Sequence, residues 1–167
     1  IDGVDSSEVW HIFRVGRRAR PQATFVELTS NTMHAVGSHN GYRFLSGQPN
    51  HRRTVEIDAD ATLRIADVIE GSGQHIVTGG YLLEPCWQAE SIEDGWRLRS
   101  GSTELTIRIQ GSIPLELTTE SRPTHPHYGV VTESQRLCWR CEAELSLRVE
   151  TEVAVKMPAP SGPLGTR

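Results

Sequence analysis

Long apolar runs are absent from this chain of 167 residues, and no positively charged, apolar leader opens it. No stretch approaches the roughly 18 apolar residues that a membrane-spanning helix needs, so the sequence predicts no membrane span. The chain begins with Ile1 instead of Met, and we expect a soluble piece, either a processed mature chain or a segment of a longer protein. The sequence leaves a periplasmic or a cytoplasmic location equally open.

Basic charge is scarce as well, with 17 Lys and Arg against 21 Asp and Glu and a net charge of -4. This balance argues against a general nucleic-acid binder, which normally carries a basic excess. Lys156 is the only lysine, so nearly all the basic side chains are arginines. Arginine presents a planar fork that suits carboxylate, sulfate or phosphate, but a GC-rich coding sequence would give the same bias without a ligand.

Cysteine is too scarce for a disulfide framework, because three cysteines cannot all pair. Cys138 and Cys141 have the C-x-x-C spacing of redox and zinc motifs, but they lie in residues 135–142, whose alternation predicts a strand. Side chains three apart in a strand point to opposite faces, so they would not share a metal without a turn or bulge. With Cys86 as the one further thiol, we interpret the cysteines as structural.

Motifs for nucleotides and metal ions are incomplete. No glycine cluster fits the phosphate-loop pattern G-x-x-x-x-G-K-[ST]. Asp58 and Asp60 lack the further oxygen ligands and the closing Glu of a calcium loop, so a hairpin turn is the better interpretation. His125 and His127 form a pair without a third ligand, and we interpret residues 120–129 as an irregular surface loop. We therefore expect no metal and no cofactor in this chain.

Short alternating segments separated by turn signals make up most of the sequence. The clearest runs from Leu145 to Val155, where apolar residues and Thr151 alternate with mostly charged residues, so that one face is buried and one is wet. Asp94-Gly95 and Gly101-Ser102 are hairpin signals between earlier segments. About ten to twelve such strands predict an all-β chain, a two-layer antiparallel β-sandwich without significant helix. Residues 158–167 are rich in Pro and Gly and predict a disordered tail.

Polar chemistry is densest in residues 37–58, GSHNGYRFLSGQPNHRRTVEID. The pattern indicates a turn at His39-Asn40-Gly41-Tyr42 that leads into a short strand, followed by a second strand that begins at His51. These side chains suit an anionic or polyhydroxylated ligand.

The candidates for substrate contact in this stretch are His39, Tyr42, His51 and Arg53. We expect their main role to be structural, with the histidine and arginine at the mouth of the strand bonded to neighbouring backbone and to carboxylates such as Asp67.

Six segments carry a resemblance to a known family. In order they read IDGVDSSEVWHIFRVGRRARP, SHNGYRFL, HRRTVEI, LRIADVIEGSGQH, PHYG and LRVETEVAV. Together they resemble the C-terminal β-sandwich domain of the heparinase II/III-like polysaccharide lyases, from Asp2 to about Val155. No single motif is very specific, but six in the same order and at fitting distances are more so. The family often has Asp-Gln-Ser where this chain has Asp5-Ser6-Ser7, and His-Asp-Gly-Tyr where this chain has His39-Asn40-Gly41-Tyr42.

The resemblance implies a domain over residues 1–157 of a bacterial protein. Members of the family eliminate across uronic-acid linkages: a cation or amide neutralises the carboxylate, a Tyr or His takes the C5 proton, and an acid protonates the leaving oxygen. Those groups belong to an upstream helical toroid and to the first strands of the β-region. No position here matches the family's catalytic or metal residues, so we assign no catalytic residue and no metal ligand.

The resulting expectation is a noncatalytic β-sandwich that supports the toroid and walls the substrate cleft. Its partners would be the upstream α-helical toroid of the same parent chain and an acidic polysaccharide such as heparin, heparan sulfate or alginate. The parent would be a polysaccharide lyase, and the fragment would be inactive alone.

Two alternatives remain open. The chain could be a free-standing carbohydrate-binding module that stacks sugars on Trp10, Tyr42, Trp87, Trp96 or Trp139, although sandwiches bury about every second strand residue and most of these rings should lie in the core. Alternatively, exposed sheet edges could pair with another copy and form an oligomer.

Overall fold

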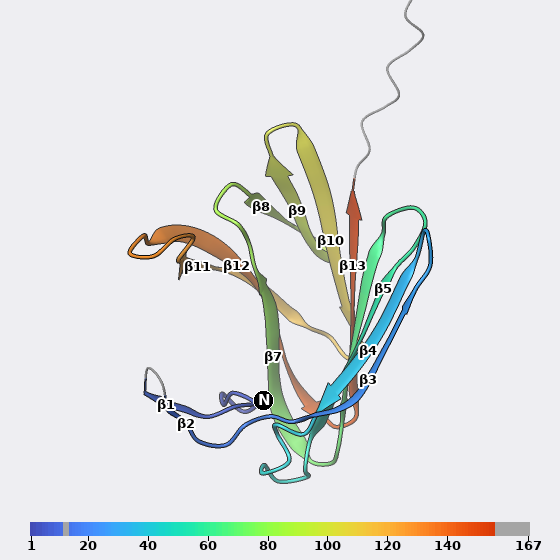
Figure 1. The fold of residues 1–167 in the computed structure, drawn as a ribbon, viewed down its shortest axis with the longest axis vertical. Coiled ribbons are helices and arrows are strands. Elements are labelled where there is room, and N and C mark those ends of the chain that lie inside the picture. Colours follow the sequence, from blue (N-terminus) through green and yellow to red (C-terminus); the bar gives the residue numbers. More distant parts are fainter. Residues whose placement is uncertain (12–13, 156–167) are drawn as a thin grey trace, which may run out of the picture.

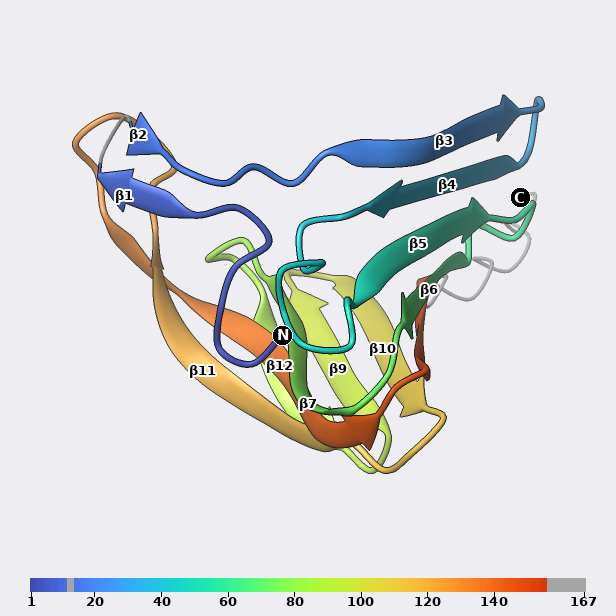
Figure 2. The same ribbon diagram turned by 90° about the horizontal axis from the view of Figure 1, so that it is seen from below.

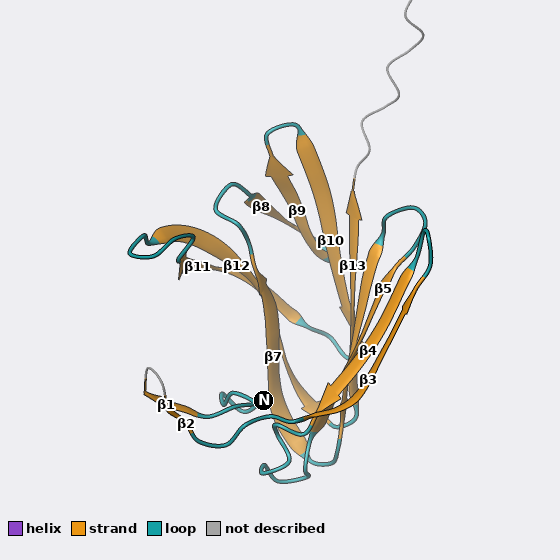
Figure 3. Ribbon diagram, viewed as in Figure 1, coloured by secondary structure: helices purple, strands orange, loops and turns teal. Residues whose placement is uncertain are grey.

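The computed structural model describes residues 1–11 and 14–155, and every regular element in that part of the chain is a β-strand (Figure 3). In chain order the strands are β1 (Val9–His11), β2 (Arg14–Val15), β3 (Pro21–Leu28), β4 (Met33–His39), β5 (Asn50–Ile57), β6 (Leu63–Glu70), β7 (Gln74–Leu82), β8 (Gln88–Ile92), β9 (Gly95–Ser100), β10 (Thr103–Gly111), β11 (Glu116–Thr124), β12 (Thr132–Glu144) and β13 (Leu147–Val155). The predicted all-β class is confirmed. Within the described residues there is no helix of the length and apolar character that crossing a membrane requires.

The strands form three antiparallel sheets (Figures 1 and 2). The large sheet has the order β3-β4-β5-β6-β13-β10-β9-β8, the second has the order β11-β12-β7, and β1 pairs with β2. The last strand, β13, lies in the middle of the large sheet: Leu147 pairs with Ile69 of β6, and Val149 pairs with Gly111 of β10. The C-terminal strand therefore joins the β3–β6 meander to the β8–β10 meander.

The core lies between the two larger sheets and follows the predicted alternation. Leu147 and Val149 are each 1% exposed, whereas Arg148 between them faces solvent. The three-stranded sheet contributes Leu137 and Trp139 of β12 to the same cluster. One face of each sheet is thus buried and the other is wet, which confirms the predicted two-layer sandwich.

Two aromatic side chains tie the layers together through their polar ends. The Trp96 Nε1–H group donates to Thr119 Oγ1 at 2.9 Å, and the Tyr81 hydroxyl donates to Thr151 Oγ1 at 2.9 Å. Buried Trp and Tyr usually find such partners, because an unpaired donor in the core would be costly. Both bonds run between the large sheet and the three-stranded sheet.

The second sheet covers only part of the first. On β13, β10 and β9 most core-facing residues are buried, but no described residue of β3 or β4 is. At the free edge, Phe25, Val26 and Leu28 are exposed although they are apolar. An exposed apolar edge strand is a surface ready for pairing with another chain or segment.

Several local predictions can be compared with the structure. Asp58 Oδ1 accepts hydrogen bonds from the N–H groups of Asp60 and Thr62, both at 3.0 Å, so the predicted hairpin turn is confirmed. The short strand expected after Tyr42 is wrong, because residues 41–47 form consecutive turns.

Two further differences concern strand boundaries. The expected irregular loop, residues 120–129, is shorter than predicted, because β11 continues to Thr124 by pairing with β12. The described residues form thirteen strands, more than the expected ten to twelve, in part because the short β1 and β2 were not anticipated. The tail, residues 158–167, lies outside the described residues, as do Ile12 and Phe13.

Candidate functional site

Strand register brings the four candidate contact residues together. His39 ends β4 and pairs with His51 of β5, while Arg53, two residues further along β5, pairs with Asp67 of β6. Residues two apart in a strand share a face, so His51 and Arg53 point the same way. Tyr42 follows in the turn, with its ring centroid 5.6 Å from that of His39.

A directed hydrogen-bond chain links the two histidines to Asp67. The Gly41 N–H donates to His39 Nδ1 at 3.2 Å, so His39 carries its proton on Nε2 and donates to His51 Nδ1 at 3.1 Å. His51 in turn donates from Nε2 to Asp67 Oδ1 at 2.6 Å. Each bond fixes the tautomer of the next ring, and the chain is complete when both imidazoles are neutral.

Arg53 holds the other side of the Asp67 carboxylate. Its Nε and Nη2 donate to Oδ1 and Oδ2 at 2.8 and 2.9 Å, the bidentate geometry that suits a guanidinium and a carboxylate. Asp67 is 2% exposed, so it lies in the interior with both of its oxygens bonded. The prediction that the histidine and arginine bond to Asp67 is therefore confirmed.

The electrostatics of this cluster follow from burial and pairing. Burial alone raises the pKa of Asp67, but the hydrogen bonds from His51 and Arg53 outweigh it and bring that pKa below its ordinary value. The hydrogen bond to Asp67 raises the pKa of Arg53. Burial is the largest cause that lowers the pKa of His39, and the nearby positive charge of Arg53 acts in the same direction. The cluster thus favours an ionised Asp67, a cationic Arg53 and a neutral His39.

A closed network of this kind is suited to holding strands in register. Every ring nitrogen of His39 and His51 already has a partner within the cluster. Burial also raises the pKa of the Tyr42 hydroxyl, which makes the phenolate harder to form. The ring nitrogens of both histidines are therefore already used in hydrogen bonds that hold this part of the sheet. Whether a substrate touches the cluster stays a prediction.

A second histidine site was missed by sequence reasoning. His75 of β7 is buried, with Nδ1 2.8 Å from Asp2 Oδ2 and Nε2 3.2 Å from the Ser72 carbonyl oxygen. Both partner atoms are hydrogen-bond acceptors. The hydrogen bond from His75 lowers the pKa of Asp2, whose Oδ1 also accepts from the Ile76 N–H at 2.9 Å. The pair fastens the start of the chain to β7. The alternation of side chains along β7 indicates that His75 points inward. It does not indicate that Asp2, 73 residues earlier in the chain, is the hydrogen-bond partner of His75.

The candidate metal residues do not assemble with further ligands in the described part of the chain, where no group of three or more His, Cys, Asp and Glu could hold a metal ion. His125 and His127 are exposed in the connection between β11 and β12. Cys138 and Cys141 both lie on β12 as free thiols, and burial raises the pKa of each, which disfavours the reactive thiolate.

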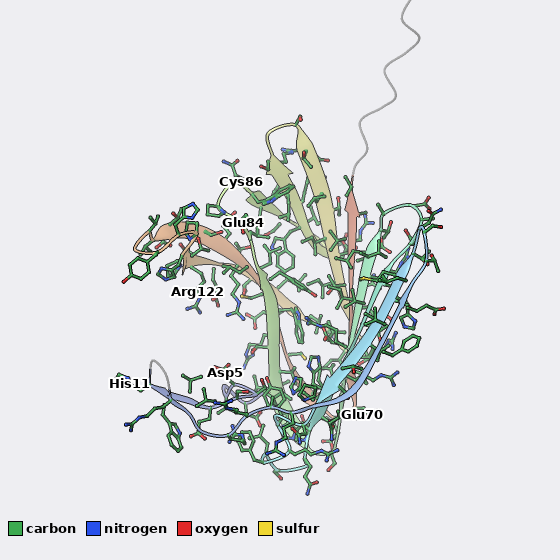
Figure 4. All side chains as sticks on the ribbon, viewed as in Figure 1. Asp5, His11, Glu70, Glu84, Cys86 and Arg122 are labelled. Atoms are coloured by element: carbon green, nitrogen blue, oxygen red, sulfur yellow. The ribbon has the colours of Figure 1, made fainter. Side chains whose placement is uncertain are left out.

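Further charged and thiol groups lie on other segments of the chain. Figure 4 shows Cys86 beside Glu84 on the connection after β7, and Asp5 and His11 near β1. The third thiol, Cys86, is exposed and free.

The five aromatic side chains considered for sugar stacking differ in how much of their surface is exposed to solvent. Trp96 and Trp139 are buried, and Trp87 and Tyr42 are half-buried against the core, as expected for most of these rings. Trp10 of β1 is different, with 67% of its surface exposed. Of the five, Trp10 alone offers a largely free ring.

Three comparisons with known proteins bear on this arrangement. A search of curated proteins finds no match. Among solved structures, a heparinase III, the BT4657 gene product, superposes on this chain with a TM-score of 0.69 at 15% identity. The matched region covers 84% of this chain and 22% of the heparinase III chain. The heparan sulfate lyase HepC from Pedobacter heparinus superposes with a TM-score of 0.70 at 13% identity. That match covers 87% of this chain and 23% of the HepC chain.

At such low identity these structures establish the fold alone, and the chain spans less than a quarter of the length of either protein. The family comparison is more specific. The sequence profile described as "Heparinase II/III-like, C-terminal" matches residues 1–157, a range that includes every described residue. This chain therefore belongs to the heparinase II/III-like C-terminal family.

Proposed function

We propose that this chain is the noncatalytic C-terminal β-sandwich of a bacterial polysaccharide lyase. In this proposal the parent protein acts by β-elimination on a polysaccharide that contains uronic acid, such as heparin, heparan sulfate or alginate. The sandwich supports an upstream helical toroid and forms one wall of the substrate cleft.

The observation that carries the proposal is the uncovered apolar surface of a sandwich from this family. Phe25, Val26 and Leu28 of β3 are more than half exposed, and so are Val9 and Trp10 of β1. Exposed apolar side chains on an unpaired edge strand such as β3 can serve as an interaction surface. The matched structures are four to five times longer than the matched segment, which covers 22–23% of them, so further chain is available in those proteins to cover such a surface.

In this proposal the four candidate contact residues lie at the edge of the domain that borders the substrate cleft. Arg53 has 46% of its side chain exposed, and Asp67 fixes its orientation through Nε and Nη2. Its Nη1 has no protein partner among the described residues and is free to meet a uronate carboxylate. His39, Tyr42 and His51 then position this edge.

The test compares the isolated chain with the longer parent protein. Uronide products of elimination carry a new double bond, so their ultraviolet absorbance reports the reaction. We expect absorbance to rise with the parent and not with residues 1–167 alone on heparin, heparan sulfate and alginate. Product formation by the isolated chain would refute the noncatalytic assignment, and an inactive parent on all such polymers would refute the lyase assignment.

A free-standing carbohydrate-binding module is the second candidate, favoured by the exposure of Trp10. If this candidate is correct, the isolated chain binds glycans in calorimetry or on an array, and Trp10→Ala reduces that binding at least tenfold, because stacking of a sugar on an aromatic ring is lost. Trp87→Ala, at a half-buried ring, is the control. Absence of binding leaves the scaffold proposal in place.

A further inference from the structure

A polar groove of about 330 Å³ lies across the middle of the large sheet. It is formed by β5, β6, β13 and β10, and its lining includes Arg64, Arg108 and Arg148. On β13 the lining residues Arg148, Glu150 and Glu152 alternate with the buried Leu147 and Val149. The groove therefore opens on the outer face of the sheet, away from the core and the three-stranded sheet.

Register explains why there is a hollow at this place. One row across the four strands reads Glu56, Arg64, Glu152 and Arg108, all long side chains. The neighbouring row reads Thr54, Ala66, Glu150 and Gln110, with its smallest side chains on β5 and β6. Long side chains beside short ones on a pleated surface leave a depression, so Ala66 lies at the floor and the arginines form the walls.

Each arginine is held by an acidic neighbour through part of its guanidinium. Arg148 donates from Nε and Nη2 to Glu150 Oε1 at 2.8 and 2.6 Å. Arg64 Nη1 lies 2.6 Å from Asp58 Oδ2, and Arg108 Nε lies 3.1 Å from Asp94 Oδ2. These pairs orient the side chains before any ligand arrives, which reduces the entropy lost on binding.

The remaining donors are available to a ligand. Arg108 contacts Asp94 through Nε and Arg148 binds Glu150 through Nε and Nη2, and no hydrogen bond of the described residues uses Arg148 Nη1 or either Nη atom of Arg108. Gln110 adds an exposed amide, and the one ion pair that Glu56 forms within residues 1–11 and 14–155 is with His34, at 3.8 Å. Free guanidinium nitrogens suit a carboxylate, and a nearby amide and carboxylate suit hydroxyl groups.

We propose that this groove binds a uronic acid unit of a saccharide, with Arg108 and Arg148 holding the carboxylate and Gln110 and Glu56 holding hydroxyl groups. The groove volume is at the lower end for small-molecule sites, so one or two sugar units fill it. The choice of a uronic acid among carboxylate-bearing ligands rests on the proposed function. The site itself is separate from the cleft wall and would retain polymer on the outer face of the domain.

The experiment is calorimetric titration of the 167-residue chain with tetragalacturonate, and with cellotetraose as the neutral control. We expect saturable binding of the acidic sugar and binding of the neutral sugar about tenfold weaker or more, since the charge-assisted bonds are missing. Equal binding of both sugars, or no saturable binding of the acidic one, would overturn the proposal.

Variants then locate the site. The double change Arg108→Gln and Arg148→Gln should weaken tetragalacturonate binding about tenfold or more, and Ala66→Leu should remove it by filling the floor. The matched control is Arg122→Gln, an equally exposed arginine paired with Glu120 on β11, away from the groove. Circular dichroism confirms that each variant is folded. Binding that is insensitive to both groove variants would exclude this location.

Failure here and failure of the lyase proposal are distinguishable. If the parent is an active lyase but the isolated chain does not bind tetragalacturonate, the groove proposal is refuted and the lyase proposal stands. If the parent is inactive but the groove binds tetragalacturonate, the lyase proposal is refuted and the binding site stands.

Discussion

The two ends of the large sheet differ in what covers them. Around β13, β10 and β9, side chains such as Trp96 and Val149 are buried against the three-stranded sheet. At β3 and β4 no described residue is buried, although Phe25 and Leu28 are as apolar as core residues. The same strand chemistry therefore stabilises the chain at one end and leaves apolar side chains exposed to solvent at the other. The Asp67 cluster lies between these two regions, on β4, β5 and β6.

The largest effect is expected in the covered region. Trp96→Ala should lower the free energy of unfolding by about 3–5 kcal/mol, because it leaves a cavity and removes the hydrogen bond to Thr119. Urea denaturation measures the change. Phe25→Ala is the matched aromatic truncation at the uncovered end, and a loss as large as that of Trp96→Ala would contradict the contrast.

At the boundary we expect an intermediate effect. Asp67→Asn removes the charge that Arg53 and His51 bind, and should cost about 2 kcal/mol of stability, less than a fully buried pair because Arg53 is partly exposed. Chemical denaturation at neutral pH measures the change. Glu150→Gln, in an exposed pair with Arg148, is the control and should cost less than about 1 kcal/mol. Equal losses would mean that the buried cluster contributes no more than a surface pair.

The same cluster predicts a dependence on pH. The pKa of His39 is lowered from 6.5, so the unfolded chain binds the proton first and stability falls as pH decreases below that value. The pKa of Asp67 is lowered from 3.8, so its contribution is present above that value and is lost as pH falls further. Denaturation between pH 7 and 5 should show declining stability in the wild type and a flatter profile in His39→Gln. An unchanged slope would exclude His39 as the source.

The smallest effect on the isolated chain is expected at the free edge. The double change Phe25→Ser and Leu28→Ser should alter the stability of residues 1–167 by less than about 0.5 kcal/mol per site, since both side chains already contact water. In the longer parent the same change should cost more and reduce lyase activity. Thermal unfolding and elimination assays of both proteins decide this, and identical effects in the two would show that nothing docks on β3.

Local patterns predicted a large part of the structure. The alternation of Leu147 and Val149 with Arg148 identified the buried face of β13, because side chains in a strand alternate whatever the strand pairs with. The Asp58 turn and the bonding of His51 and Arg53 to Asp67 were also predictable, since the β5–β6 connection is short. The length of β11 was not, because β12 decides how far pairing continues.

The sequence by itself determined the class of fold, the inner and outer faces of its clearest strand and the residues of the Asp67 cluster, since these depend on neighbours close along the chain. Only the tertiary structure placed β13 between β6 and β10, joined Asp2 to His75, gathered four strands around the groove at Ala66 and left β3 uncovered. These features depend on contacts between distant segments, and the free energy of such contacts is not encoded in any local period.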